Sequence, residues 1–380
     1  MKKYAVIGLG FGDEGKGLTT SYLCSKNKNS LVVRFNGGHQ AGHTVYSGPI
    51  RHIFSNFGSG TLHGCPTYWD KKCTVDPIAL INEYLFLINQ GFNPKIYIDN
   101  ECSITTPYDK HHNQISENAN NHGSCGVGFG ATIGREENFY SLKFIDLFYP
   151  KILEEKLKGV RSYYESYLTF DNEGIQEFLD ACEVIRDCAT IIPVNEMPII
   201  RVSHTPLTYD NIIYEGAQGL LLDQNIGFFP NVTRSNTGLE RNNLNPDEIY
   251  LVTRAYQTRH GNGYMSNENL KRLKDSIKIN PEETNQEHPY QGKFRRSILD
   301  LDLLEYGINR DSVIRNHKNK TLVITCLDHI NDYVFTYNGK KRTCKSEIDF
   351  ILRIKEMLEC YNVLVSRSPY TEGVVEHQGI

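Results

Sequence analysis

The sequence contains no long apolar run, and none of its hydrophobic stretches approaches the roughly 20 residues that a membrane-spanning helix needs. Its ten cysteines include no CxxC pair, so neither a zinc ribbon nor a redox dithiol is indicated. Basic residues are not in excess, because 41 Lys and Arg face 45 Asp and Glu, a net charge of −4. Overall charge therefore gives no reason to bind nucleic acid or an anionic membrane, and an anionic ligand must be bound locally.

The chain also lacks any internal repeat, low-complexity tract or change of composition that would mark a linker. The apolar stretch after Lys2 and Lys3 ends at Asp13, too short for the core of a secretory signal. Cysteines scattered along a long chain suggest a reducing compartment. We therefore expect a soluble, cytoplasmic protein whose residues 1–380 form a single domain.

Short apolar runs alternate with helical stretches, the pattern of an α/β fold. Several runs are apolar on both faces, as buried parallel strands are. We predict a large, mainly parallel central sheet flanked by helices, with a phosphate-binding glycine loop after the first strand. The predicted strands are Tyr4–Leu9, Leu31–Phe35, Lys95–Asp99, Asn211–Tyr214, Leu322–Cys326 and Asn362–Val365.

Two packing helices carry clear start signals. Asp76 as N-cap and Pro77 at the first position begin one helix, which Gly91 ends. Its side formed by Ile78, Ile81, Leu85 and Ile88 is predicted to be buried, and a second helix spans 346–358. The polar segments are expected to be long functional loops, at about 36–48, 120–137, 233–249 and 261–296.

The stretch from Gly8 to Gly17 is the most informative part of the chain, and two patterns overlap in it. Gly10, Gly12 and Gly15 satisfy the dinucleotide pattern GxGxxG, while Gly10 to Lys16 satisfies the phosphate-loop pattern GxxxxGK. The first lacks an acidic residue at the end of the second strand, where Arg34 could instead meet a 2′-phosphate. The second lacks a hydroxyl after the lysine. Both patterns still indicate backbone N–H groups converging on an anion at a helix start.

Carboxylates are unusual inside such a loop, because they repel phosphate. Asp13 and Glu14 make sense there if one of them holds Mg²⁺ or removes a proton. The second strand is followed by another glycine segment, 36–44, whose His39 and His43 have a zinc-helix spacing that the glycines disfavour. We expect the two glycine turns to face one another, so that Asp13 and His39 form an acid/base pair.

Four segments, two of them in the glycine segments described above, resemble motifs of the adenylosuccinate synthetase family and occur in the same order. They are GDEGKG at Gly12–Gly17, GGHQAGHT at Gly37–Thr44, EGAQG at Glu215–Gly219 and VTRSNT at Val232–Thr237. Later, TCLD at Thr325–Asp328 and SRSP at Ser366–Pro369 stand where the family has TKLD and STGP. The likeness covers nearly the whole chain, and the joint order of the motifs makes it specific.

The resemblance implies a GTP- and Mg²⁺-dependent ligase that joins IMP and L-aspartate to adenylosuccinate through a 6-phosphoryl-IMP intermediate. Asp13 resembles the family base that takes the N1 proton of IMP, and His39 the acid beside the transferring phosphoryl group. The metal would lie on Asp13 and the carbonyl of Gly38, which would explain why Gly17 can stand where other phosphate loops need a hydroxyl.

Further roles are implied residue by residue. GTP would be bound by Gly12, Gly15, Lys16, Gly17, Gln40, Arg295, Asp328, Ser366 and Ser368, with Asp328 reading the guanine. IMP would be bound by Asn36, Gly37, Gly38, Cys125, Arg135, Gln218 and Thr233, with Arg135 reaching a neighbouring subunit's IMP, which implies a homodimer. Aspartate would be bound by Gly292, Lys293, Arg295 and Arg296.

The chain departs from the family pattern at several positions. Cys125 stands for a phosphate-binding Thr, Val127 for a loop Arg and Cys326 for the Lys of TKLD. Two alternatives therefore stay open: a ligase of the phage type that joins aspartate to dGMP, and a nucleotide-binding homologue without turnover. The phage-type relatives replace the base with a smaller residue, so the presence of Asp13 favours IMP.

Overall fold

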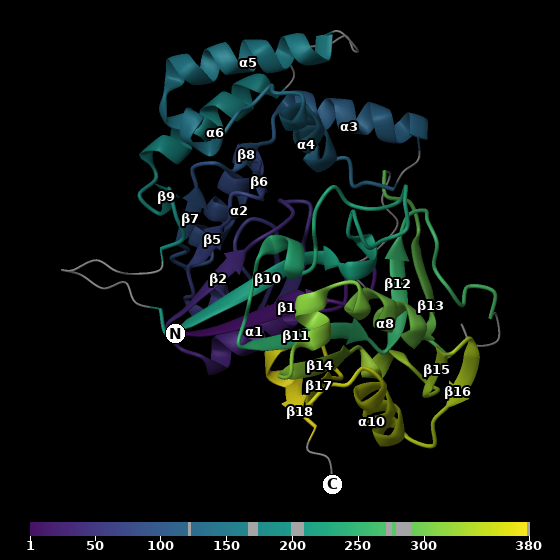
Figure 1. The fold of residues 1–380 in the computed structure, drawn as a ribbon. Helices are drawn as coiled ribbons and strands as arrows, with labels where there is room; N and C mark the ends of the chain where they lie inside the picture. Colours follow the sequence, from purple (N-terminus) through teal and green to yellow (C-terminus); the bar gives the residue numbers. More distant parts are fainter. Residues whose placement is uncertain (121–122, 166–173, 199–208, 271–275, 279–289, 378–380) are drawn as a thin grey trace.

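A computed structural model describes the whole chain except residues 121–122, 166–173, 199–208, 271–275, 279–289 and 378–380. A ten-stranded sheet forms its centre (Figure 1), in the order β18-β17-β14-β11-β1-β10-β2-β5-β7-β9. In that order the strands are Val374–Glu376, Asn362–Ser366, Lys320–Thr325, Glu248–Arg254, Lys2–Gly8, Asn211–Gly219, Ser30–Arg34, Thr67–Trp69, Ile96–Asp99 and Ile191–Val194. Neighbours pair in parallel except β17 and β18. The predicted α/β class and all six predicted strands are confirmed.

The central strands are buried on both faces, as their apolar runs predict. In β1, Ala5 and Ile7 belong to one apolar cluster, while Tyr4 and Val6 belong to another. Successive side chains of a strand point to opposite faces, so the two clusters lie on opposite sides of the sheet. Burial of each such side chain stabilises the fold by roughly 1.5–3 kcal/mol.

Helices and smaller sheets surround this centre. The described helices are α1 (Lys16–Lys26), α2 (Pro77–Asn89), α3 (Pro107–Asn120), α4 (Phe129–Glu137), α5 (Pro150–Glu165), α6 (Ile175–Asp187), α8 (Leu301–Asn309), α9 (Ser312–Asn316) and α10 (Glu347–Met357). The smaller sheets are β12 (Tyr256–His260), β13 (Phe294–Asp300), β15 (Val334–Tyr337) and β16 (Lys340–Thr343), the hairpin of β3 (His43–Ser47) and β4 (Ile50–Phe54), and the pair of β6 (Thr74–Val75) and β8 (Ser103–Ile104). Figure 1 shows α3 to α6 together at the top of the view, and β12 and β13 to the right of the central sheet.

Both predicted packing helices form, but one of them turns differently. The Asp76 side chain caps α2 by accepting the N–H groups of Ile78 and Ala79. Leu85 and Ile88 of α2 are exposed, so only part of the predicted apolar side is buried. The buried residues of α2 include Ile81 from that side, together with Leu80 and Leu87. In α10, Phe350, Ile351 and Ile354 are buried under an N-cap at Ser346.

The predicted long loops contain more regular structure than expected. The 36–48 loop includes β3, the 120–137 loop includes α4, and the 233–249 loop reaches the first residues of β11. The 261–296 loop ends in β13, and its residues 271–275 and 279–289 lie outside the described residues, as do 121–122. Short polar helices and strand ends lack a long apolar period, which is why the sequence pattern hid them.

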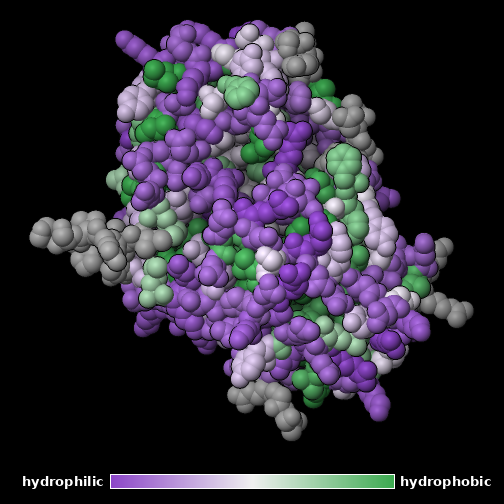
Figure 2. Space-filling model, in the orientation of Figure 1, coloured by the Kyte–Doolittle hydropathy of each residue, from purple (hydrophilic) through white to green (hydrophobic). Residues whose placement is uncertain are grey.

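Hydrophilic side chains cover most of the face shown in Figure 2, with hydrophobic ones scattered singly or in small groups. Among the described residues, no helix combines the length and apolar character needed to cross a bilayer.

Candidate active site

The carboxyl ends of the central strands meet at one edge of the sheet, and a cavity of about 1060 Å³ opens there. Residues that follow β1, β11, β14 and β17 line it, together with the end of β10. Parallel α/β sheets bind ligands at this edge, because loops from successive strands converge on it. The wall draws on residues from Phe11 to Pro369, almost the full length of the chain.

The glycine loop after β1 is folded around its own carboxylate. Glu14 is buried, its Oε1 accepts the N–H groups of Gly10 and Gly12, both at 2.9 Å, and its Oε2 lies 2.7 Å from Lys16 Nζ. A Cβ atom at Gly8 would stand 2.4 Å from Glu14 Oε2, and one at Gly219 would stand 2.6 Å from Oε1. Glu14 is therefore a structural residue of the loop, and these neighbours must be glycine to admit it.

The next residues present the loop to the cavity. Gly12, Asp13 and Gly15 have φ values of 93°, 58° and 100°, so three of the four neighbouring residues 12–15 adopt the left-handed conformation. Arg254 Nε donates to the carbonyl of Asp13 at 2.6 Å, and Thr325 Oγ1 donates to that of Glu14 at 2.7 Å. Asp13 is thus held in a strained conformation by neighbours from β11 and β14, with its carboxylate in the cavity wall.

Gly17 is explained by packing. A Cβ atom there would lie 2.7 Å from His43 Cβ and 3.0 Å from Ser59 Oγ, so a Ser or Thr does not fit. His43 Nδ1 lies 2.9 Å from Glu215 Oε1, which ties β3 to β10. This buried pair replaces the zinc site that the spacing of His39 and His43 resembled.

In this structure, Asp13 and His39 each have a partner other than the one predicted. His39 Nε2 lies 3.3 Å from Asp76 Oδ2, and His39 is outside the described cavity lining. The imidazole beside Asp13 is that of His260, whose Nε2 lies 3.4 Å from Asp13 Oδ2. The difference arises because Asp76, already the N-cap of α2, presents its second oxygen to His39 and Lys110.

The segment that carries His39 leaves polar atoms unsatisfied. His39 Nδ1 and both amide atoms of Gln40 are buried and have no hydrogen-bond partner among the described residues. Burial lowers the pKa of His39 although Asp76 opposes this effect. Buried polar atoms without partners are costly, so this segment is ready to accept a ligand or a new partner.

Eleven predicted site residues line the cavity together: Gly12, Asp13, Gly15, Lys16, Gly17, Gln40, Cys125, Gln218, Thr233, Asp328 and Ser368. Ten are not part of the described lining: Asn36, Gly37, Gly38, His39, Arg135, Gly292, Lys293, Arg295, Arg296 and Ser366.

Some of the second group support the wall from behind. Asn36 donates from Nδ2 to the carbonyl of Ala217 and accepts its N–H at Oδ1, which fastens the end of β2 to β10. Gly37 packs so closely on Ala217 that a Cβ atom would come within 2.8 Å of it. Ser366 Oγ donates to the carbonyl of Ser368, so Ser366 shapes the turn that brings Ser368 to the cavity.

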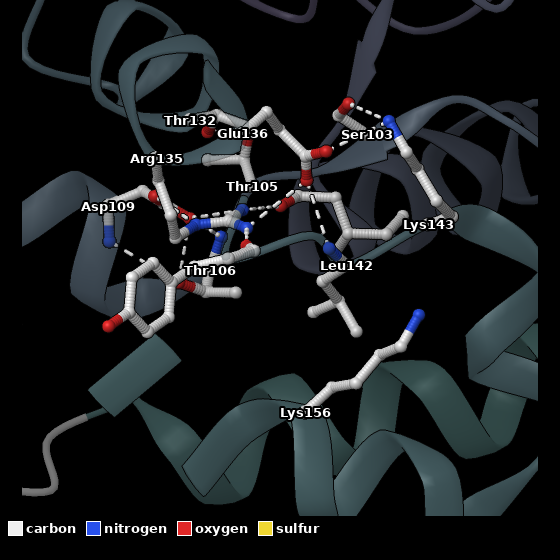
Figure 3. A network of polar contacts seen from close by, with 12 residues as sticks. Ser103, Thr105, Thr106, Asp109, Thr132, Arg135, Glu136, Leu142, Lys143 and Lys156 are labelled. Atoms are coloured by element: carbon white, nitrogen blue, oxygen red, sulfur yellow. Dashed lines mark hydrogen bonds and ion pairs between the residues drawn. The ribbon is translucent and has the colours of Figure 1, made fainter. Parts of the chain in front are cut away.

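Arg135 is a structural residue, contrary to its predicted contact with a nucleotide phosphate. It is fully buried, with its Nε 2.9 Å from Asp109 Oδ1 and its Nη2 donating to the carbonyl of Ile104. Glu136 and the carbonyl of Tyr140 also accept from it. Figure 3 shows the guanidinium enclosed between Asp109 and Glu136. Its donors are used inside the protein, so it cannot reach a ligand or a neighbouring subunit.

The two arginines predicted to clamp aspartate lie on β13. Arg295 pairs in register with Arg259 of β12 and donates to Glu268 and to the carbonyl of Gly263, both at 2.8 Å. Arg296 lies over the ring of Phe294. A clamp formed by these two side chains would require them to leave these contacts.

The cavity-lining residues that escaped the sequence analysis include Arg234, Arg254, Arg259 and His260. Burial, reinforced by repulsion from Arg295, lowers the pKa of Arg259 to about 10, so it remains charged at neutral pH. Arg254 ends β11, and a charged residue at the carboxyl end of an apolar strand was the available signal. His260 and Arg259 end β12, a strand that the sequence analysis did not predict.

The described residues contain no cluster of three or more His, Cys, Asp or Glu arranged for a metal. Mg²⁺ does not require such a cluster, because it is usually held by one or two carboxylates together with substrate phosphates. Asp13 supplies one carboxylate in the cavity wall. The carbonyl of Gly38 accepts the N–H of Ala41, and Gly38 lies outside the described lining, so the pair of Asp13 and Gly38 as metal ligands stays a prediction.

A parallel sheet with a glycine loop, a buried lysine and several arginines at its carboxyl edge defines an α/β protein that binds phosphorylated ligands. A carboxylate and an imidazole lie within the same cavity, as acid/base chemistry requires. The sequence model of the adenylosuccinate synthetase family matches residues 5–366 of this chain. The chain therefore belongs to the adenylosuccinate synthetase family.

Relatives agree with this assignment. The chain is 30% identical over 352 residues to the adenylosuccinate synthetase of Borrelia duttonii, covering 87% of this chain and 78% of the relative. It is 28% identical over 401 residues to that of a Thermoanaerobacter species, covering 98% and 89%.

Two solved structures share the fold. The fully ligated adenylosuccinate synthetase of Plasmodium falciparum matches with a TM-score of 0.76 and 18% identity, over 99% of both chains. The succinoaminodeoxyadenylate synthetase of cyanophage S-2L, bound to dGMP and to dATP as an energy donor, matches with 0.67 and 14%, over 100% of this chain and 96% of that one.

Proposed function

We propose that this protein is a GTP-dependent ligase that joins IMP and L-aspartate to form adenylosuccinate, GDP and phosphate. The observation that carries this proposal is the position of Asp13, a carboxylate held by the phosphate-binding loop in the wall of a cavity large enough for two nucleotides. Family membership supplies the reaction, and the geometry supplies a base beside an anion site.

Asp13 is proposed to take the N1 proton of IMP, which makes O6 nucleophilic toward the γ-phosphate of GTP. A general base needs a fixed orientation as well as a suitable proton affinity. Arg254 supports the orientation of Asp13 by donating a hydrogen bond to its carbonyl. Gln218 is proposed to hold the purine, because Gly12 and Gln218 are neighbours in the wall. Phosphoryl transfer then depends mainly on positioning and charge.

The GTP phosphates are proposed to lie over the open N–H groups at the start of α1, with Lys16 beside them. Among the described side chains, none caps this helix. Mg²⁺, which the family uses, would be held by Asp13 together with substrate phosphates and would neutralise their charge. Asp328, which follows the carboxyl end of β14, is proposed to accept the guanine N–H groups.

His39 is proposed to donate to the transferring phosphoryl group, and this role requires its ring to exchange Asp76 for a ligand. The unsatisfied Nδ1 of His39 and amide of Gln40 support such an exchange. For aspartate, we propose that Arg295 and Arg296 act together with Arg259 and Lys293. We also propose that the protein is cytoplasmic and forms a homodimer. Its ten free cysteines are consistent with a reducing compartment.

The test is to follow adenylosuccinate formation by absorbance with IMP, GTP, aspartate and Mg²⁺. Wild type should form product, and Asp13→Asn should lose about 10²–10⁴-fold in kcat, the usual contribution of a positioned base. Calorimetry should show that this variant still binds GTP. Undiminished turnover in Asp13→Asn would show that the base lies elsewhere, and a wild type active only with dGMP would identify a ligase of the phage type.

A further inference from the structure

Arg234 is a cation in the cavity wall that none of the roles above uses. It follows Thr233 and packs on α4, where a Cβ atom at Gly134 would stand 2.6 Å from its Nη1 and one at Gly130 would stand 4.0 Å from its Cδ. These two glycines lie about one turn apart and also line the cavity. Without side chains there, the guanidinium can lie flat against α4 and face the cavity.

The ion pair that Arg234 makes is weak. Its Nη1 lies 3.6 Å from Glu137 Oε2, and the two side chains are 56% and 66% exposed. Exposed pairs of this kind contribute little, because water and salt screen them. A phosphate offers a guanidinium shorter, paired hydrogen bonds, so it can displace Glu137.

The other described cations of the wall already have close partners within the protein. Lys16 pairs with buried Glu14, and Arg254 donates to Asp13 and to Tyr256. Arg259 donates to the carbonyls of Tyr264 and Asn231 and lies over the ring of Phe11. Arg234 differs because its ion pair with Glu137 is long and exposed.

The loop in front of α4 provides the remaining half of an anion site. Gly128 is the N-cap of α4 with φ 93°, and no described side chain caps the first N–H groups of this nine-residue helix. Ser124 and Cys125 line the cavity before it, and burial raises the pKa of the Cys125 thiol to about 11. This set is neutral, and Arg135 is locked away, so a phosphate placed here needs another cation.

We propose that Arg234 binds the 5′-phosphate of the nucleoside monophosphate, between α3 and α4. The position reaches α3 as well: burial lowers the pKa of His112, Asp109 opposes this, and the charge of Arg234 adds to it. The proposal rests on the proposed function for the identity of the monophosphate. It means that this chain supplies, from its own sequence, the cation that holds that end of the substrate.

The test is calorimetric titration of wild type and Arg234→Ala with IMP, inosine and GTP. Arg234→Ala should weaken IMP binding at least about tenfold, as expected for losing a hydrogen-bonded charge, and leave inosine and GTP unchanged. In turnover, KM for IMP should rise more than kcat falls. Arg241→Ala is the matched control, because Arg241 is exposed and lies outside the described lining.

Glu137→Gln gives an independent measurement, since it keeps Arg234 and removes its competitor. This variant should bind IMP at least about twofold more tightly than wild type. Equal IMP affinities in wild type and Arg234→Ala would overturn the Arg234 proposal and leave the proposed function intact. If wild type binds dGMP and not IMP, the proposed function fails, while the same tenfold loss for dGMP would uphold Arg234. Binding of neither nucleotide would overturn both.

Discussion

Single residues in this cavity divide into those that meet a ligand and those that build the wall. Asp13 and Glu14 are adjacent carboxylates in one loop, yet the first faces the cavity and the second fills the loop from inside. Their difference follows from backbone direction, because Asp13 has φ 58° and Glu14 precedes the left-handed Gly15. Chemistry at this site thus depends on a single residue's conformation as much as on its type.

Asp328 is the residue for which nucleotide selectivity can be tested most directly. Its carboxylate lies in the cavity wall and is 39% exposed, with His329 Nε2 3.5 Å away. A carboxylate can accept hydrogen bonds from the two guanine N–H groups, which adenine does not offer. Asp328→Asn should therefore raise KM for GTP at least about tenfold and reduce the preference for GTP over ATP. Steady-state kinetics with GTP, ITP and ATP measure this. An unchanged ratio between GTP and ATP would contradict the assignment.

At the scale of elements, α4 is fixed to α3 by a buried ion pair. Arg135 of α4 and Asp109 of α3 are both fully buried, and Tyr164 of α5 also donates to Asp109. The three helices therefore share one carboxylate. This arrangement explains why Arg135, which follows the glycine-rich segment 123–130, has a structural role.

Arg135→Leu should lower the free energy of unfolding by about 3–5 kcal/mol, because it leaves the Asp109 carboxylate buried and unpaired. Arg161→Ala is the control, since it breaks only the exposed pair with Glu165 and should leave the free energy of unfolding nearly unchanged. Urea unfolding measures both. A stable Arg135→Leu variant with impaired IMP binding would instead restore the ligand role predicted from sequence.

The elements also show what the sequence could reveal. The strands were predictable because buried parallel strands are apolar on both faces, and the loop from Gly8 to Gly17 because its conformation is local. The partner of Asp13 was not predictable, since the choice between His39 and His260 depends on where Asp76 lies. For the same reason, spacing could not show that Arg135 meets Asp109, 26 positions away. Local pattern identifies a loop, whereas side-chain partners are decided by packing.

At the scale of the whole molecule, buried ionisable groups link stability to pH. Burial raises the pKa of Glu215, but interactions with His43, Arg34 and Ser59 outweigh it and bring the pKa to about 2. Burial lowers the pKa of His43. In both cases the unfolded chain binds protons that the folded chain refuses, so stability falls as the solution becomes acidic.

We expect the melting temperature to decline as pH drops below about 6.5, and more steeply from about 4.5 toward 2. The depressed pKa of Glu215 corresponds to about 3 kcal/mol of stability that is present above pH 4.5 and lost toward pH 2. Thermal melts of wild type and Glu215→Gln measure this. The variant should be less stable at pH 7 and show a flatter acidic limb; parallel curves would contradict the role of Glu215.

The wall of the cavity runs from Phe11 to Pro369, and this has a consequence for the protein's synthesis. A growing chain on the ribosome completes the glycine loop first, but the surface that meets the far end of its nucleotide emerges only with the last strands. Partial chains released by early termination would hold most of the sheet and still be unable to enclose both substrates. The complete wall of the cavity therefore exists only once translation has nearly finished.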